Sequence, residues 1–198
     1  MIAGKAGELP AAGSTCETLF GVAEWPSWAR EHVELHPPDK AWRERGFQAG
    51  RLLEAALAAW LVAPIEHVGS TAVPGLPAKP ILDLQAAVAD LACASRVAAT
   101  LAPAGWQYVP PELDARPWRR FFVQIADGHR IAHLHLMTRS SPRWGEQVVF
   151  RDALRADPAL AQRYTTLKRL LATRYAGDRE AYTAAKGNFI RAVLQQQR

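Results

Sequence analysis

The chain has 198 residues, of which 49% are hydrophobic and 22% are charged, and its net charge is +5 at pH 7. This length and composition are typical of one globular domain and exclude an intrinsically disordered chain. The small excess of Lys and Arg permits binding to phosphates. Because there are no dense basic runs, we find no strong nucleic-acid signal.

The sequence gives no sign of export or membrane insertion. Cys16 and Cys93 have neither a metal-binding nor a redox spacing, which indicates a reducing compartment. Residues 1–20 lack the basic and apolar regions of a signal peptide. The longest apolar stretch, Leu52–Ile65, is interrupted by Glu54 and is too short to span a bilayer. The sequence therefore predicts a cytoplasmic protein with no membrane partner.

The N-terminal part predicts a tail followed by the start of a domain. Residues 1–22 are rich in Gly and Ala, show little periodicity and predict a flexible tail. This leaves residues 23–198 as a single domain, which begins with a short helix predicted over Trp25–Glu31.

A short strand and the first long helix come next. Residues 33–35 predict a strand, and Asp39 is suited to cap a helix that begins near Lys40 and ends at Pro64. An apolar stripe at helical spacing runs along this helix: Trp42, Phe47, Leu52 or Leu53, Ala56, Leu57 and Trp60.

The central stretch, Ile65–Gln85, combines a short apolar strand, a Gly-Ser turn, a loop rich in Pro and Gly, and a second strand. Residues 80–88 are nearly all apolar, as expected of an interior strand that is covered on both faces. The remainder of the domain is expected to be built around these two neighbouring strands.

The second half of the chain predicts further strands and then a run of helices. We expect a helix over 89–102, strands over 106–109, 118–125 and 130–138, and helices over 141–156, 157–175 and from 178 towards the C-terminus. The strands at 118–125 and 130–138 are joined by the turn signal Asp127-Gly128. This order predicts an α/β (α+β) fold, in which a mixed sheet is followed by a C-terminal helical layer.

Asp83 is the strongest candidate for a functional residue. A charged, unpaired carboxylate inside an apolar strand costs several kcal/mol, so Asp83 needs a metal, a cation, hydrogen-bond donors or a cleft. Gly69 and Ser70 can present N–H groups and a hydroxyl to a phosphate, and a metal held by Asp83 would neutralise that phosphate. The alternative is an aspartate that holds a loop through backbone N–H groups.

Two histidines share one face of a predicted strand. His133 and His135 alternate along it, so both imidazoles point the same way and can bind one metal, act as acid and base, or contact phosphate. Together with Asp83 they form the predicted catalytic and metal-binding set. Because nitrogen ligands favour Zn²⁺, Mn²⁺ or similar ions over Mg²⁺, we expect a divalent metal at this site, with a transition metal bound more tightly than Mg²⁺.

Basic side chains are candidates for the phosphate-binding wall. Lys168 and Lys186 each follow a tyrosine by four residues on the apolar stripe of a predicted helix, which directs their amines to a cleft. The alternative is that both lysines snorkel to the surface. The remaining phosphate or nucleotide candidates are Gly69, Ser70, Thr71, Lys79 and Arg120.

The segment His67–Leu76, followed by Ala78–Asp83, resembles the signature of the GrpB-like family. Further matching positions are Arg120-Phe121-Phe122, His133-Leu134-His135-Leu136, Phe150-Arg151-Asp152, Tyr164 with Lys168, and Tyr182 with Lys186 and Phe189. The resemblance covers roughly Val33 to the C-terminus. It implies the nucleotidyltransferase superfamily fold.

The resemblance implies a metal-dependent nucleotidyltransferase that takes a nucleotide or another phosphorylated small molecule and acts on an unidentified acceptor. The usual pattern of that fold is Asp-x-Asp or Asp-x-Glu, whereas this chain has Asp83-Leu84-Gln85 and lacks the second carboxylate. The alternative is therefore a non-catalytic nucleotide- or anion-binding module with an incomplete metal site. Family members also occur fused to dephospho-CoA kinase, which implies an accessory role near coenzyme A metabolism.

Overall fold

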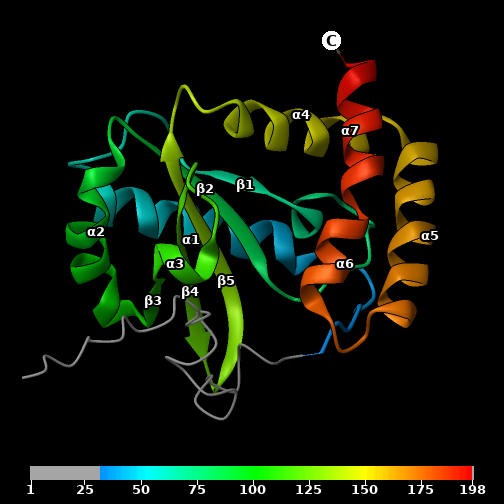
Figure 1. Cartoon of the computed structure of the whole chain (residues 1–198), viewed down its shortest axis with the longest axis horizontal. Helices are drawn as coiled ribbons and strands as arrows, with labels where there is room; N and C mark the ends of the chain where they lie inside the picture. The colour runs from blue at the N-terminus through cyan, green and yellow to red at the C-terminus, as the bar shows by residue number, and fades with distance from the viewer. Residues whose placement is uncertain (1–31, 198) are drawn as a thin grey trace, which may run out of the picture.

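The computed structural model describes residues 32–197, and one five-stranded sheet runs through their centre (Figure 1). The strands are β1 (Glu66–Val68), β2 (Leu82–Val88), β3 (Trp106–Val109), β4 (Arg120–Ala126) and β5 (His129–Thr138). Their order across the sheet is β1-β2-β5-β4-β3. The β2 and β5 strands are parallel and all other neighbours are antiparallel, so the predicted mixed sheet is confirmed.

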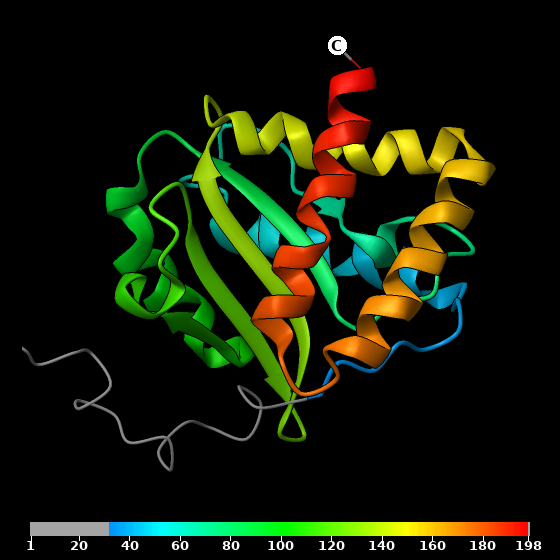
Figure 2. The same cartoon turned by 45° about the vertical axis from the view of Figure 1, so that its right-hand side comes forward.

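Seven α-helices lie in the described residues: α1 (Ala41–Leu57), α2 (Ala94–Leu101), α3 (Pro111–Asp114), α4 (Pro142–Ala156), α5 (Pro158–Arg174), α6 (Arg179–Ala185) and α7 (Gly187–Gln196). Helices α4 to α7 follow the last strand and form the predicted C-terminal layer on one side of the sheet (Figures 1 and 2). Helix α1 lies behind the sheet, and α2 lies beside it.

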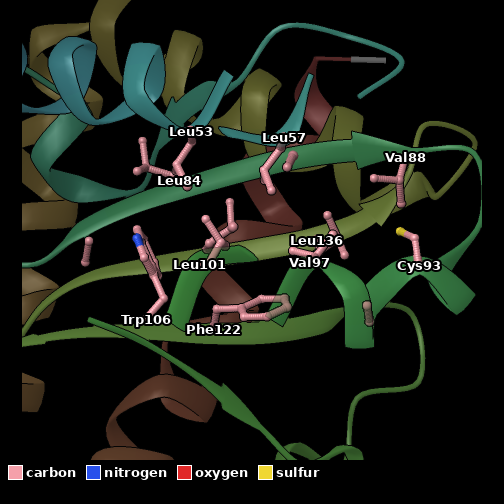
Figure 3. Close-up of a cluster of buried hydrophobic side chains, with 14 residues drawn as sticks. Leu53, Leu57, Leu84, Val88, Cys93, Val97, Leu101, Trp106, Phe122 and Leu136 are labelled. Carbon is pink, nitrogen blue, oxygen red and sulfur yellow. The ribbon is translucent and has the colours of Figure 1, made fainter. Parts of the chain in front are cut away.

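The main hydrophobic core fills the space between one face of the sheet and helices α1 and α2 (Figure 3). Leu53 and Leu57 from α1 meet Leu84 of β2, and on the same sheet face Leu134 and Phe122 are fully buried. Alternation along each strand sends the next residues, including Asp83 and His133, to the opposite face. The packing of one face thus fixes which side chains are available to a site on the other.

The C-terminal layer is attached to the loop after β1 rather than to the main core. Val73 and Leu76 of that loop pack with Leu154, Leu160 and Tyr164 from α4 and α5. An ion pair adds a second attachment, because Arg151 of α4 donates to Glu66 Oε2 of β1 at 2.6 Å. The helical layer and the sheet can therefore enclose a cleft between them.

Several element boundaries differ from the predicted ones. Residues 33–35 form no strand; His36 makes only an isolated bridge to Ala78. The first helix ends at Leu57 instead of Pro64, since Leu61 pairs with Val88 at the end of β2. Its buried side chains are Trp42, Leu53 and Leu57, while Phe47 and Leu52 of the predicted stripe are 59% and 74% exposed.

Other differences lie at the cleft rim and at the C-terminus. The loop over 110–117 contains the short helix α3, and the final helix is interrupted at Lys186, between α6 and α7. The Asp127-Gly128 turn is confirmed, with φ of 51° and 75° as in a type I′ hairpin.

The predicted tail over 1–22 and the helix over Trp25–Glu31 lie outside the described residues. Within residues 32–197, no helix has the length and hydrophobicity needed to cross a bilayer.

Close packing of α1 on β1 makes Gly46 a sensitive position. A Cβ atom at Gly46 would collide with the imidazole ring of His67. We expect Gly46→Ala to lower the free energy of unfolding by about 1–3 kcal/mol despite the higher helix propensity of alanine. Urea unfolding would measure this. Gly145→Ala in α4 is the matched control, because nothing lies within 4 Å of its added Cβ, and should stabilise by roughly 0.5–1 kcal/mol. Equal effects at the two sites would contradict the packing argument.

Candidate functional site

A cleft of about 750 Å³ lies between the polar face of the sheet and the C-terminal helices. Its floor is formed by β2, β5 and β4, one wall by the loop after β1, and the opposite wall by α4 to α7. The lining includes Asp83, both strand histidines and both candidate lysines. The sequence candidates from four separate parts of the chain therefore meet in one cavity.

Asp83, His133 and His135 come together on the floor. Asp83 is paired with His133 in the β2–β5 register, and His133 Nδ1 lies 2.9 Å from Asp83 Oδ1. His135 Nε2 lies 3.8 Å from the same oxygen. All three side chains offer a ligand atom within 4.8 Å of the others. Strand alternation predicts this convergence, while the chemical roles of the three residues stay predictions.

The charges on the floor follow from burial and hydrogen bonding. Burial raises the pKa of Asp83, but the hydrogen bond from His133 and the nearby imidazole of His135 lower it more, so the pKa lies well below its ordinary value. Burial lowers the pKa of His133, and Asp83 offsets this only in part. Burial also lowers the pKa of His135, to about 4. At neutral pH the floor thus holds one carboxylate and two neutral imidazoles.

The turn after β1 approaches Asp83 closely because it contains a glycine. Gly69 has φ of 71° and ψ of −168°, a conformation that is essentially restricted to glycine. A Cβ atom there would lie 2.9 Å from Asp83 Cβ. The next residue, Ser70, opens the short 3₁₀ helix Ser70–Ala72 and directs its hydroxyl toward Lys168.

Lys168, which is buried, and Lys186, which is half-buried, form a basic wall. Lys168 is 1% exposed; its Nζ lies 3.1 Å from Ser70 Oγ and donates to the Pro77 carbonyl. Lys186 Nζ lies 4.2 Å from the centre of the Tyr182 ring, at cation–π distance. Both amines reach the cleft, so the snorkelling alternative is wrong for both lysines.

The pKa values of both lysine amines are lowered by burial and by a neighbouring positive charge. Burial, followed by the positive charge of Lys186, lowers the pKa of Lys168 to about 7. Burial and the charge of Lys79 lower the pKa of Lys186 to about 8, against the opposing effect of Asp83. Within the described chain, neither amine forms an ion pair with a carboxylate. Such a wall is suited to an anionic ligand.

Arg120 does not line the cleft, contrary to the expectation from sequence. It shares a face of β4 with Phe122, which is fully buried in the main core, and its guanidinium donates to the carbonyls of Arg119 and Pro117. Arg119, immediately before it, lies in the cleft instead. Alternation along the strand could have indicated this. Arg119 and Phe121 share one face, and Phe121 pairs with His135, which faces the cleft.

Arg119 is held in place by an acidic partner and an aromatic ring. Its Nε and Nη2 donate to the two carboxylate oxygens of Asp114, at 2.8 and 2.5 Å. Its guanidinium stacks 4.1 Å from the centre of the Phe121 ring, and Nη1 donates to His135 Nδ1. The sequence did not identify Asp114 as a site residue because the short helix α3 that carries it was not predicted. It did not identify Phe121 because the face of β4 that lines the cleft was not recognised.

The remaining candidates have mixed placements. Lys79 lines the cleft, with Nζ 5.9 Å from the centre of the Tyr182 ring. Thr71 also borders the cleft, but its hydroxyl donates to the Ile81 carbonyl and contacts His67 Nε2 at 3.0 Å, so it fastens the loop to β2. Gln85 is fully buried, and its Nε2 donates to the Trp144 carbonyl at 3.2 Å.

Comparisons with known proteins agree with the resemblance noted from the motifs. A UPF0157 protein of Pseudomonas aeruginosa is 35% identical over 178 residues, covering 88% of this chain and 72% of that protein. A UPF0157 protein of Streptomyces coelicolor is 34% identical over 161 residues, covering 81% and 82%. A dephospho-CoA kinase of Mycolicibacterium paratuberculosis is 30% identical over 185 residues, and the match spans 45% of its length.

A solved structure and a family model lead to the same group. The crystal structure of conserved protein GrpB from Enterococcus faecalis has a TM-score of 0.72 to this chain at 26% identity, covering 82% of this chain and 96% of that one. The family model described as GrpB protein matches residues 32–196. The chain belongs to the GrpB family.

Proposed function

We propose that the cleft binds the phosphates of a nucleotide and transfers a nucleotidyl group to a hydroxyl or phosphate acceptor. The observation that carries this proposal is the pair of amines from buried Lys168 and half-buried Lys186, which lack a carboxylate partner within the described chain. An uncompensated buried cation is costly, and a phosphate would supply the missing negative charge. Ser70 lies beside Lys168 and would donate its hydroxyl to the same phosphate.

A divalent cation is part of the proposal because Asp83 faces the same space. Asp83, His133 and His135 are the residues that would hold it, and the span of 4.8 Å between their ligand atoms fits a single ion. One carboxylate and two imidazoles suit Zn²⁺ or Mn²⁺ better than Mg²⁺, which prefers oxygen ligands. When bound, such an ion would neutralise phosphate charge and polarise the reacting phosphoryl group.

The side chains of the cleft would orient the substrate. The two lysines and Ser70 would fix the phosphates against the wall, and Asp83 would lie on the floor below. Because the cleft is partly shielded from water, charge–charge interactions within it are stronger than at an open surface.

A non-catalytic anion-binding module is the second candidate, and Gln85 favours it. The position where this fold usually carries a second carboxylate is occupied by an amide that is fully buried and bonded to a backbone carbonyl. It therefore supplies no negative charge for a second metal ion, which routine two-metal transfer requires. This candidate keeps the lysine wall but predicts no turnover.

A thermal-shift screen of nucleoside triphosphates, each with and without Mn²⁺, Zn²⁺ and Mg²⁺, would test the proposal. A ligand at 100 times its Kd stabilises the native state by about 2.7 kcal/mol, which is a shift of roughly 5 °C or more for a domain of this size. Lys186→Met should abolish the shift. Pyrophosphate release from the stabilising nucleotide separates the two candidates, because only the transferase releases it. No shift with any nucleotide would overturn both.

The buried lysines also predict opposite effects of pH on stability and on binding. The pKa of Lys168 is about 7 in the folded protein and near 10.4 in the unfolded chain, so between these values the unfolded chain binds more protons. Stability of the free protein should therefore rise from about pH 7 to about pH 9, before the neighbouring tyrosines titrate. Affinity for a phosphate should fall over the same range, as the amine loses its charge.

Chemical denaturation and calorimetry at several pH values would measure the two trends. The groups that face Lys168 are Lys186, Tyr164 and Ser70, and burial raises the pKa of Tyr164 above its ordinary range. Lys168→Met should make the stability profile less steep and leave the part that Lys186, with a pKa of about 8, contributes. A profile that stays unchanged in this variant would assign the trend to other groups.

A further inference from the structure

Arg119 determines which nitrogen of His135 carries the proton. A guanidinium has only N–H donors and stays charged in proteins, so it cannot accept a hydrogen bond. Because Arg119 Nη1 bonds to His135 Nδ1, that nitrogen must be the acceptor. A neutral imidazole with a bare Nδ1 carries its proton on Nε2, the nitrogen that faces Asp83 Oδ1.

The arginine is not free to move away from this contact. Its other two donating nitrogens are engaged by both oxygens of Asp114, and its flat face lies on Phe121. Arg119 and Asp114 are each 7% exposed. Such a bidentate, stacked arrangement is rigid, so the proton position on His135 is set by the fold.

His133 presents an N–H to the same carboxylate. Its Nδ1 lies 2.9 Å from Asp83 Oδ1, and its Nε2 is buried with no hydrogen-bond partner within the described chain. A proton on that Nε2 would be left unsatisfied at a cost of about 1–3 kcal/mol. Both histidines therefore direct N–H groups at Asp83 in the free protein.

We propose that Arg119 is a positioning residue that holds His135 as a hydrogen-bond donor and withholds it from metal coordination. A metal binds the lone pair of an imidazole nitrogen, and Nε2 of His135 has none while Nδ1 accepts from Arg119. The distances on the floor admit three ligands, but these hydrogen bonds leave only the carboxylate oxygens of Asp83 and the lone pair on the buried Nε2 of His133. This inference rests on the proposed function and changes its metal site: His135 would donate to a phosphate oxygen beside Asp83 and would not be one of the three ligands.

The proton position can be read in the free protein by long-range ¹H–¹⁵N correlation spectra, which distinguish the two tautomers of a neutral histidine. The chain has six histidines, and the signals of His135 are assigned by their absence in His135→Ala. We expect the Nε2–H tautomer. A proton on Nδ1, alone or together with Nε2, would overturn the proposal. This readout needs no nucleotide, so it is independent of whether the proposed function is correct.

Metal titration of variants gives the second test, with Zn²⁺ alone as the probe. Arg119→Gln supplies an amide oxygen that can accept from Nδ1–H, which frees the Nε2 lone pair. We expect Zn²⁺ to bind about tenfold more tightly to this variant, within the usual range for changes behind a metal ligand. Arg119→Lys keeps a purely donating group and should resemble the wild type.

Two control variants test whether the change in Zn²⁺ affinity comes from His135. Arg116 also bonds to Asp114, but its other guanidinium nitrogen donates to Glu180 and not to His135, so Arg116→Gln should leave Zn²⁺ affinity unchanged. Adding His135→Ala to Arg119→Gln should remove the gain. An equal gain in Arg119→Lys or in Arg116→Gln would show that loss of the acidic cluster, and not the tautomer of His135, changes metal affinity, and would overturn the proposal.

Discussion

Replacing Lys168 with methionine is expected to stabilise the free protein by about 3 kcal/mol and to abolish its stabilisation by nucleotides. The pKa of Lys168 is lowered from 10.5 to about 7, which corresponds to roughly 5 kcal/mol at 1.36 kcal/mol per pH unit. The variant also loses hydrogen bonds to Ser70 and to the Pro77 carbonyl, each contributing about 1 kcal/mol. The difference leaves a net gain, as when other buried charges are replaced by apolar groups of similar size.

Urea unfolding at pH 7 and calorimetry with the best nucleotide of the screen would measure the two effects. Lys40→Met is a matched control, since Lys40 is exposed just before α1 and its replacement should change stability by less than about 0.5 kcal/mol. A Lys168→Met protein that is less stable than the wild type would show that the amine is compensated in the folded state. In that case the wall would not need an anion, and the main support for the proposed function would be lost.

The parts of this fold that could be predicted from sequence are those where local signals and packing agree. The strand alternation that buries Leu84 and Leu134 in one core must send Asp83, His133 and His135 to the other face, whatever the arrangement of the helices. The positions of Asp157 and Asp178 before two helices were readable because a side-chain cap depends only on neighbouring residues.

The parts that could not be predicted depend on contacts between distant segments. The sequence predicts that the first helix ends at Pro64, but the helix ends at Leu57 because Leu61 pairs with Val88. No local pattern reveals that Leu61 has a strand partner 27 positions away. Arg120 was the phosphate candidate in β4, but in sequence Arg119 with Phe121 and Arg120 with Phe122 alternate equally well, so the sequence does not show which pair faces the cleft. Burial of Phe122 in the core decides the matter, and it places Arg119 in the site.

The close approach of the turn to the floor explains why a glycine stands at position 69 and predicts a large effect of changing it. Gly69→Ala places a methyl group 2.9 Å from Asp83 Cβ and 3.1 Å from its Cγ, and it forces an alanine into a conformation with φ of 71°. The clash and the backbone strain together should lower the free energy of unfolding by about 3 kcal/mol. Because Asp83 must move to relieve the clash, nucleotide binding should weaken as well.

Gly75→Ala separates the clash from the strain. Gly75 has a similar φ of 76°, but an added Cβ meets nothing within 4 Å, so this variant should lose only about 1 kcal/mol. A double-mutant cycle completes the test, because Asp83→Ala removes the Cγ contact and leaves the Cβ contact. Gly69→Ala should then cost about 1 kcal/mol less in the Asp83→Ala background than in the wild type. Additive effects of the two substitutions in urea unfolding would mean that the turn and the carboxylate do not press on each other, and that Gly69 is required for its backbone conformation alone.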